Sequence, residues 1–432
     1  MADDAPTTII IDLVELLCQE QSIDTVDMRS TEFTTTAIRT VLLPLLTNSS
    51  VRSLYLPIDR VDLICAKTLV LMIQNNIGPP IEDLYLSNMP IEGQSDSSEL
   101  CRHSSMIISS LKHNRRIKKL HIAPENALHR SVISSITAVL YDNKVISALT
   151  LRGCGISHIG ATKISCALAN NGSIVVLDLS NNPLYDGGVC SVALAIEMNQ
   201  TIEKVKLSGT NMGRKGGEAI AAALAINTSL EVLDMSRNAL DDHVITKLSR
   251  SLKCNSSLKQ LSLKSNTFSD IGALCLSLAM YDSIDLQTVL GCNHTLRYLN
   301  INSNQLSRKC IMYTDNALRR NAFSSSFNEA IRAKVSSFLL EAEPNCLFLR
   351  KHFGTAETSL HLMPHLLCSM NNCTTAMYHL MKNLIVNTLT TTHNEISAER
   401  SLTDSVFSFD NNCNGDTKDG NVPATVHLNF NE

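Results

Sequence analysis

Long apolar runs and blocks of basic charge are both scarce in this 432-residue sequence. No stretch approaches the roughly 18 apolar residues that a membrane-spanning helix needs. The formal net charge is -4 at pH 7. The most basic segment, KHNRRIKK at 112–119, reads as solvated charge around a helix end. Because an extended basic footprint is missing, we predict neither nucleic acid nor membrane among the partners.

The common catalytic motifs are absent as well. The sequence contains no phosphate-binding glycine loop, no G-x-S-x-G, no H-E-x-x-H and no paired C-x-x-C. GRKGGE at 213–218 lacks the spaced G-K-[ST] of a phosphate loop, and its Gly216 is predicted to be a turn glycine. Three other segments carry a glycine at the same place, namely Gly160, Gly188 and Gly272. We predict a protein without catalytic residues or cofactor, and therefore not an enzyme.

The N-terminus gives no sign of a secretory signal peptide. MADDAPTTIIIDLVELLCQEQ has no basic segment, and Asp12 and Glu15 interrupt its apolar stretch. The fourteen cysteines are scattered, which suits reduced, buried thiols better than a disulfide framework. We therefore expect an intracellular protein of the cytoplasm or the nucleus.

What the sequence does contain is a repeat. The segment NNGSIVVLDLSNNPL at 170–184 recurs with its first apolar residue at Ile174, Ile202, Leu230 and Leu258, each 28 residues after the last. A fixed period of this length indicates stacked units. The template L-x-x-L-x-L-x-x-N-x-L finds six further copies, which start at Ile23, Val51, Ile81, Ile117, Ile146 and Leu296.

This pattern resembles the leucine-rich repeat family, in its long ribonuclease-inhibitor type, over roughly residues 10–310. The resemblance implies a strand and a helix in each unit, stacked into an α/β solenoid with a concave parallel sheet and outer helices. The residues agree, because Leu177 and Leu179 alternate on one face as in a strand. Between strands, GGEAIAAALAIN is rich in helix formers, with Ile220, Ala223 and Leu224 on one face.

Four segments follow from this pattern. We expect an N-terminal capping helix at 1–22, about ten repeats at 23–310, a helical segment at 311–387 and a polar, disordered tail at 388–432. The capping box SSFNEA at 325–330 starts one of the later helices. Residues 281–291 are an insertion, read as a lengthened helix or a loop.

Asparagine stands three residues before most repeat starts. Asparagine readily adopts the left-handed conformation, so we predict that these residues end each helix in that conformation. The positions are Asn48, Asn114, Asn143, Asn171, Asn199, Asn227, Asn255 and Asn293, with Gly78 in one copy. Six of the seven N-x-[ST] sequons begin at this position, namely at Asn48, Asn171, Asn199, Asn227, Asn255 and Asn293. The seventh begins at Asn372. Helix termination therefore accounts for them without glycosylation.

A second asparagine follows each of four strands, at Asn182, Asn238, Asn266 and Asn304. The family resemblance implies that its side chain bonds to backbone along the stack. Cys154 and Thr210 take this position in two other copies. One histidine and cysteine cluster, HLMPHLLC at 361–368, has helical spacing suited to zinc. Pro364 interrupts that helix and no fourth ligand is evident, so we predict packing and no metal site.

Candidate binding residues come from the x between the second and third leucine of the template, which we call the central x. Its side chain projects from the open face of the sheet. Strands lie about 4.8 Å apart, so successive x residues should touch. Tyr55, Tyr85 and His121 then form an aromatic patch of the kind that is enriched at protein interfaces, although ordinary strand preference also explains it. Asp178, Lys206 and Asp234 form a charged group, for which solvated cross-strand pairing is the alternative explanation.

Two functional hypotheses remain. The first is a non-enzymatic interaction scaffold that binds a protein on its concave face. The second is a GTPase-activating regulator, because Ran GTPase-activating proteins are built from similar repeats and use arginines on the repeat turns. Arg152 and Arg237 are candidates, but their match to a functional position is open, and the tail lacks the acidic run of that family. The sequence names no partner.

Overall fold

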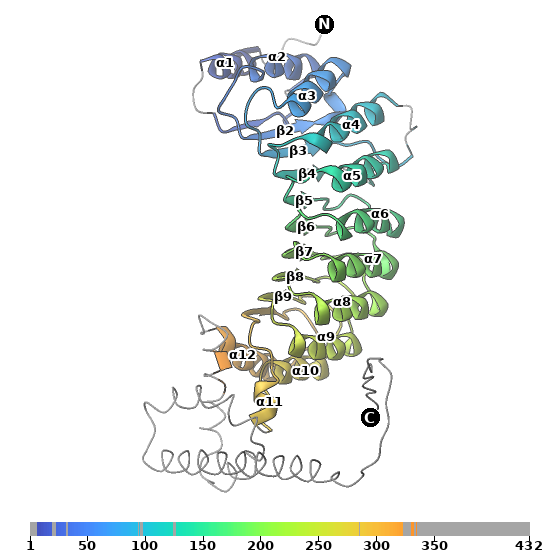
Figure 1. The fold of residues 1–432 in the computed structure, drawn as a ribbon, viewed down its shortest axis with the longest axis vertical. Helices are drawn as coiled ribbons and strands as arrows, with labels where there is room; N and C mark the ends of the chain where they lie inside the picture. Colours follow the sequence, from blue (N-terminus) through green and yellow to red (C-terminus); the bar gives the residue numbers. More distant parts are fainter. Residues whose placement is uncertain are drawn as a thin grey trace, which may run out of the picture. The chain divides into compact units, whose positions relative to one another are not determined.

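The computed structural model describes residues 7–19, 23–31, 33–93, 95, 98–123, 127–284 and 286–322, together with 330, 331 and 334. Ten strands in these ranges form one parallel sheet in the order of the sequence, from β1 to β10 (Figure 1). The predicted continuous sheet is confirmed, with the Val205 strand between those of Leu177 and Leu233. The strands are β1 Thr25–Asp27, β2 Ser53–Pro57, β3 Asp83–Ser87, β4 Lys119–Ala123, β5 Ala148–Thr150, β6 Val176–Asp178, β7 Lys204–Lys206, β8 Val232–Asp234, β9 Gln260–Ser262 and β10 Tyr298–Asn300.

Helices alternate with the strands and stack on one side of the sheet (Figure 1). They are α1 Thr7–Cys18, α2 Thr35–Leu45, α3 Leu63–Asn75, α4 Glu99–Ser110, α5 Arg130–Asp142, α6 His158–Ala169, α7 Tyr185–Met198, α8 Arg214–Ile226, α9 Asp242–Cys254, α10 Asp270–Met280, α11 Leu286–Leu290 and α12 Arg308–Ala322. Two short 3-10 turns accompany them, η1 Ile58–Arg60 and η2 Leu111–His113. The insertion at 281–291 thus contains the separate helix α11.

The core lies between the sheet and the helices. Leu177 and Leu179 are almost wholly buried from the strand side. The predicted helix face is confirmed, since Ile220, Ala223 and Leu224 are buried as well. Each unit buries its apolar face against its two neighbours, which is how stacked repeats share one continuous core.

The asparagines that precede each repeat end their helices, but not in the predicted left-handed conformation. Asn199 has φ -92° and ψ 131°, which is extended backbone, and Asn143, Asn227 and Asn255 are extended too. The prediction was wrong because the asparagine side chain, and not a special backbone conformation, satisfies the helix end. Asn76 does adopt the left-handed conformation at the end of α3, with φ 53°.

The side chain of Asn199 shows this arrangement. Its Nδ2 donates to the main-chain oxygens of Leu168 and Asn171 in the preceding repeat, both at 2.7 Å. Its Oδ1 accepts from the backbone N–H groups of Thr201 and Ile202, at 2.8 and 2.9 Å. One buried amide therefore joins a helix end, the next strand and the neighbouring repeat.

The same bond from asparagine amide to asparagine carbonyl recurs between successive repeats, and we call it the asparagine ladder. It joins Asn143 to Asn114, Asn171 to Asn143, Asn199 to Asn171, Asn227 to Asn199, Asn255 to Asn227 and Asn293 to Asn255. Asn321 at the end of α12 extends it by one step, because its Nδ2 donates to the oxygen of Asn293 at 3.1 Å. The six sequon asparagines in the array are buried, so their amides are inaccessible in the folded chain.

The second set of asparagines bonds along the stack as the resemblance implied. Asn238 Nδ2 donates to the oxygens of Leu207 and Met235, at 2.9 and 3.0 Å. Its Oδ1 accepts from the backbone N–H of Thr210, in the preceding repeat. In the Cys154 copy, the thiol donates to the oxygen of Ile122. Burial raises the pKa of that thiol.

The glycines predicted to be turn residues instead lie in the first turns of helices. Gly188 belongs to α7, and a methyl group there would lie 3.1 Å from Ala161 Cβ and 3.2 Å from the backbone of His158. Gly216 in α8 and Gly272 in α10 are equally crowded by the preceding repeat. These glycines recur because adjacent helices approach closely, a constraint that spacing within one repeat does not reveal.

Of the helical segment predicted at 311–387, the structure describes residues 311–322, which belong to α12, and Ala330, Ile331 and Lys334, which are helical. The 361–368 cluster, Asn372 and the tail from 388 lie outside the described residues.

Candidate functional site

Backbone register brings the central x residues into one row across the open face of the sheet, which we call the strand face. Tyr55 is opposite Tyr85, and Tyr85 is opposite His121. Asp178 is opposite Lys206, which is opposite Asp234. All six candidate residues thus lie in a single row, in two groups separated by Thr150.

The first group is an aromatic stack. The ring centroids of Tyr55 and Tyr85 are 5.2 Å apart with an interplanar angle of 29°. Those of Tyr85 and His121 are 5.7 Å apart at 22°. Offset stacking at these distances stabilises aromatic pairs beyond the area they bury. Each ring is half-buried and so keeps part of its surface open to a partner.

Arg29 completes the stack and was missed by the sequence analysis. Its guanidinium carbon lies 4.5 Å from the centroid of Tyr55 and 4.9 Å from that of Tyr85, within cation–π range. The carboxylate of Asp27 accepts two hydrogen bonds from Arg29, one from Nε at 2.9 Å and one from a terminal guanidinium nitrogen at 2.5 Å. Arg29 follows Asp27 by two residues, so strand alternation already placed it on the same face. We call Arg29, Tyr55, Tyr85 and His121 the aromatic stack.

Two pKa shifts follow from these contacts. The hydrogen bond from Arg29 lowers the pKa of Asp27 below its ordinary value, so the pair stays charged at neutral pH. Burial lowers the pKa of His121, which favours the neutral ring within the stack. The stack therefore presents one fixed cation above uncharged rings.

The second group forms part of a shallow hollow on the strand face between β5 and β9, with a volume of about 320 Å³. Lys206 Nζ lies 3.6 Å from Asp178. Asp234 instead accepts hydrogen bonds from the backbone and hydroxyl of Ser236. We call this region the polar hollow, and its charged residues are Arg152, Asp178, Lys206, Asp234, Arg237 and Lys264. Lys264 was not singled out from the sequence.

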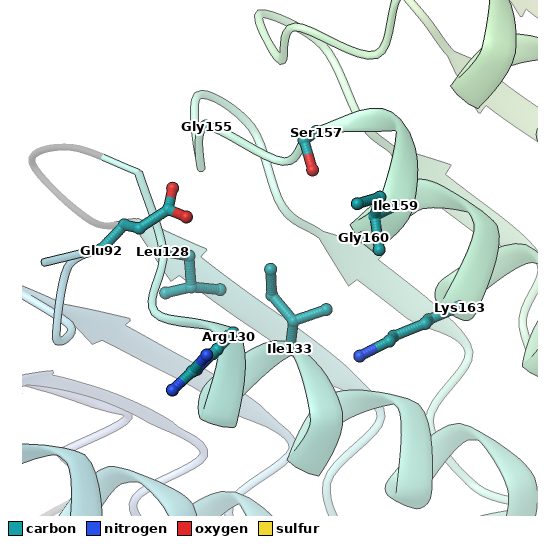
Figure 2. A pocket seen from close by; sticks show the side chains of 9 residues that line it. All are labelled: Glu92, Leu128, Arg130, Ile133, Gly155, Ser157, Ile159, Gly160 and Lys163. Atoms are coloured by element: carbon teal, nitrogen blue, oxygen red, sulfur yellow. The ribbon is translucent and has the colours of Figure 1, made fainter. Parts of the chain in front are cut away.

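A second pocket, of about 230 Å³, lies away from the six candidates (Figure 2). In that view Leu128 and Ile133 lie between the carboxylate of Glu92 and the side chain of Lys163. Arg130, at the start of α5, also lines it, and its other residues come from the loop before α6 and from α6 itself. None of the predicted site residues lines it.

Other site classes find little support in the described part of the chain. Within those residues, no cluster of three histidine, cysteine or acidic side chains could hold a metal ion. No helix among them is long and apolar enough to cross a membrane. The three lysines of the basic stretch at 112–119 pair with acids, namely Lys112 with Asp142, Lys118 with Glu82 and Lys119 with Asp83.

Comparison with a family model decides what the repeats are. The model described as Leucine Rich repeat matches residues 199–221, 227–243, 254–277 and 292–308. The array is built of leucine-rich repeats. No curated protein sequence matches.

Two solved structures are similar to parts of this chain. The structure titled "Leiomodin-1 Actin-Binding Site 2 (ABS2)" is 18% identical, covers 36% of this chain and 86% of its own, and superposes with a TM-score of 0.31. The tropomodulin C-terminal domain of Caenorhabditis elegans is 16% identical, covers 38% and 92%, and has a TM-score of 0.32. Leucine-rich repeats are typically protein-interaction modules.

Proposed function

We propose that this protein is a non-enzymatic scaffold whose strand face binds a protein partner, with the aromatic stack as the energetic centre of the contact. The observation that carries the proposal is the continuous arrangement of Arg29, Tyr55, Tyr85 and His121. Tyrosine and arginine are enriched among the few residues that dominate binding energy.

The stack is also suited to binding because it is already ordered. Asp27 restrains Arg29, and each ring limits the rotation of its neighbour. A partner that covers these side chains therefore loses less conformational entropy than it would on independently moving tyrosines. The backbone beneath is fixed by the sheet, since Leu54 and Leu84 are buried in the core.

Alanine substitution tests this directly. A partner captured with the full chain is purified, and its affinity is measured for the wild type, Tyr55→Ala and Tyr85→Ala. We expect each change to weaken binding by roughly 1–3 kcal/mol. Leu194→Ala is the control, because Leu194 is an exposed apolar side chain on α7, on the helical side. Equal affinities for all four proteins would contradict the proposal.

The GTPase-activating hypothesis has one supporting observation, which is that Arg152 and Arg237 line the same hollow. It requires that the purified protein accelerate GTP hydrolysis by a Ran-type GTPase, and that Arg152→Ala or Arg237→Ala reduce the rate. Because we propose a binding scaffold, we expect no acceleration. Stimulated hydrolysis that depends on either arginine would replace the scaffold proposal.

A further inference from the structure

The polar hollow lies on the strand face next to the aromatic stack, yet its chemistry is different. Cations and serine hydroxyls line it, and no aromatic ring does. We propose that the polar hollow binds an acidic segment of a protein partner through glutamate or aspartate carboxylates, with Arg152 at one end and Arg237 and Lys264 at the other. This deepens the proposed function by stating the charge of the partner, and its test separates the two sites.

The hollow has more cationic side chains than its own acidic side chains can pair with. Asp178 is nearly buried, pairs with Lys206 and accepts the backbone N–H of Ser180 at 3.0 Å. Asp234 accepts the N–H and the hydroxyl of Ser236, at 2.9 and 2.5 Å. These bonds leave three cations, whose side chains form no ion pair or hydrogen bond with any residue that the structure describes. They are Arg152, Arg237 and Lys264.

Arg237 lies at a turn position where the backbone is left-handed, with φ 55°. The equivalent position one, two and three repeats earlier is held by Gly209 with φ 66°, Asn181 with φ 58° and Gly153 with φ 66°. In the next two repeats it is held by Ser265 and Ser303, with φ 57° and 60°. A long side chain is rare in this conformation, which glycine and asparagine tolerate best.

Sheet geometry sets the spacing of the carboxylates. Arg152 follows β5 and Lys264 follows β9, so four strand spacings separate them, about 19 Å. Arg237 belongs with Lys264, because its backbone N–H donates to the oxygen of Lys264 at 2.7 Å. An extended segment rises about 3.3 Å per residue, so acids about six residues apart reach both ends of the hollow.

The two acids of the hollow favour carboxylates over phosphate groups. Asp178 and Asp234 lie between the two cationic ends, and they repel a phosphate carrying nearly two charges more strongly than a single carboxylate. Arginine binds a carboxylate through two parallel hydrogen bonds, which suits Arg152 and Arg237. Ser180 and Ser208 add hydroxyl donors between them.

The test is fluorescence anisotropy with a labelled peptide, Glu-Glu-Ser-Gly-Ser-Gly-Glu-Glu, added to the full chain. Comparison peptides carry glutamine in place of glutamate, or phosphoserine in place of the outer acids. The variant Arg152→Gln, Arg237→Asn, Lys264→Gln removes the free cations. Asparagine is chosen at Arg237 because it suits the left-handed backbone. Lys204→Gln is the matched control, because Lys204 is exposed on β7 at the other edge of the strand face.

We expect the triple variant to bind the glutamate peptide at least tenfold more weakly, with its thermal midpoint unchanged. Lys204→Gln should bind like the wild type, and added salt should weaken the wild-type complex. Tyr55→Ala should also bind like the wild type, so a failure of the aromatic stack proposal leaves this result intact. Equal affinity for the glutamine peptide, equal affinity of the triple variant, or a preference for the phosphoserine peptide would each overturn the proposal.

Discussion

The Nδ2 group of Asn199 donates a 2.7 Å hydrogen bond to the main-chain oxygen of Asn171, one repeat earlier. This bond ties adjacent repeats together inside the protein, where an unpaired polar group is costly. Removing the side-chain amide takes away a hydrogen-bond partner from four backbone groups at once, namely two carbonyls and two N–H groups.

The first prediction is that Asn199→Gly and Asn199→Val both destabilise the array, by about 1–3 kcal/mol, because each leaves buried backbone groups unpaired. Urea unfolding monitored by circular dichroism measures the change. Asn211→Gly is the matched control and should be nearly neutral, since Asn211 is exposed and left-handed with φ 55°. A neutral Asn199→Gly would mean that the ladder contributes nothing.

Two adjacent glycines in α7 provide the second prediction. Gly188→Ala should cost about 1–3 kcal/mol, since the new methyl would meet Leu184, Ala161 and the backbone of His158 at 3.0–3.2 Å. Gly187→Ala should be neutral or stabilising by up to about 1 kcal/mol, because its nearest contact is 3.7 Å and alanine favours helix. Thermal midpoints compare the two. Similar effects at both positions would show that helix spacing does not impose the glycine.

The aromatic stack predicts energetic coupling between Tyr55 and Tyr85 without any partner. In a double-mutant cycle with alanine, the two changes should be non-additive by about 0.5–1.5 kcal/mol. Tyr85 and Tyr298, on distant strands β3 and β10, should be additive. Free energies of unfolding from urea titrations supply the cycle, and additivity of Tyr55 with Tyr85 would mean that their stacking has no energetic weight.

His121 predicts a pH dependence. Burial lowers its pKa in the folded chain below the ordinary 6.5, so near and below pH 6.5 the unfolded chain binds more protons. The free energy of unfolding should therefore show no loss from His121 above about pH 6.5. It should fall as the pH drops through that value toward the pKa of His121 in the folded chain. Urea midpoints measured between pH 5 and 8 test this. His121→Gln should remove part of the acid-side loss, and an unchanged profile would contradict the assignment.

The repeat fold and the strand register could be predicted because each follows from spacing within one repeat. Tyr55, Tyr85 and His121 meet because the central x has a fixed place in every strand. The conformation of Asn199 could not be predicted, because its partners lie 28 and 31 residues earlier, in another repeat. Gly188 was misjudged for the same reason. Arg29 was missed because the candidate list stopped at the central x, although strand alternation continues two residues further.

The most direct test of the central claim is site-specific photo-crosslinking with benzoylphenylalanine placed at Tyr85 or at Leu194. The first position lies in the aromatic stack and the second is exposed on the helical side. Each protein is mixed with the purified partner, and crosslinked product is quantified by gel. We expect strong crosslinking from position 85, weak crosslinking from position 194, and loss of the position-85 product when unlabelled wild type competes. Crosslinking from position 194 with none from position 85 would place the partner on the helices and contradict binding at the strand face.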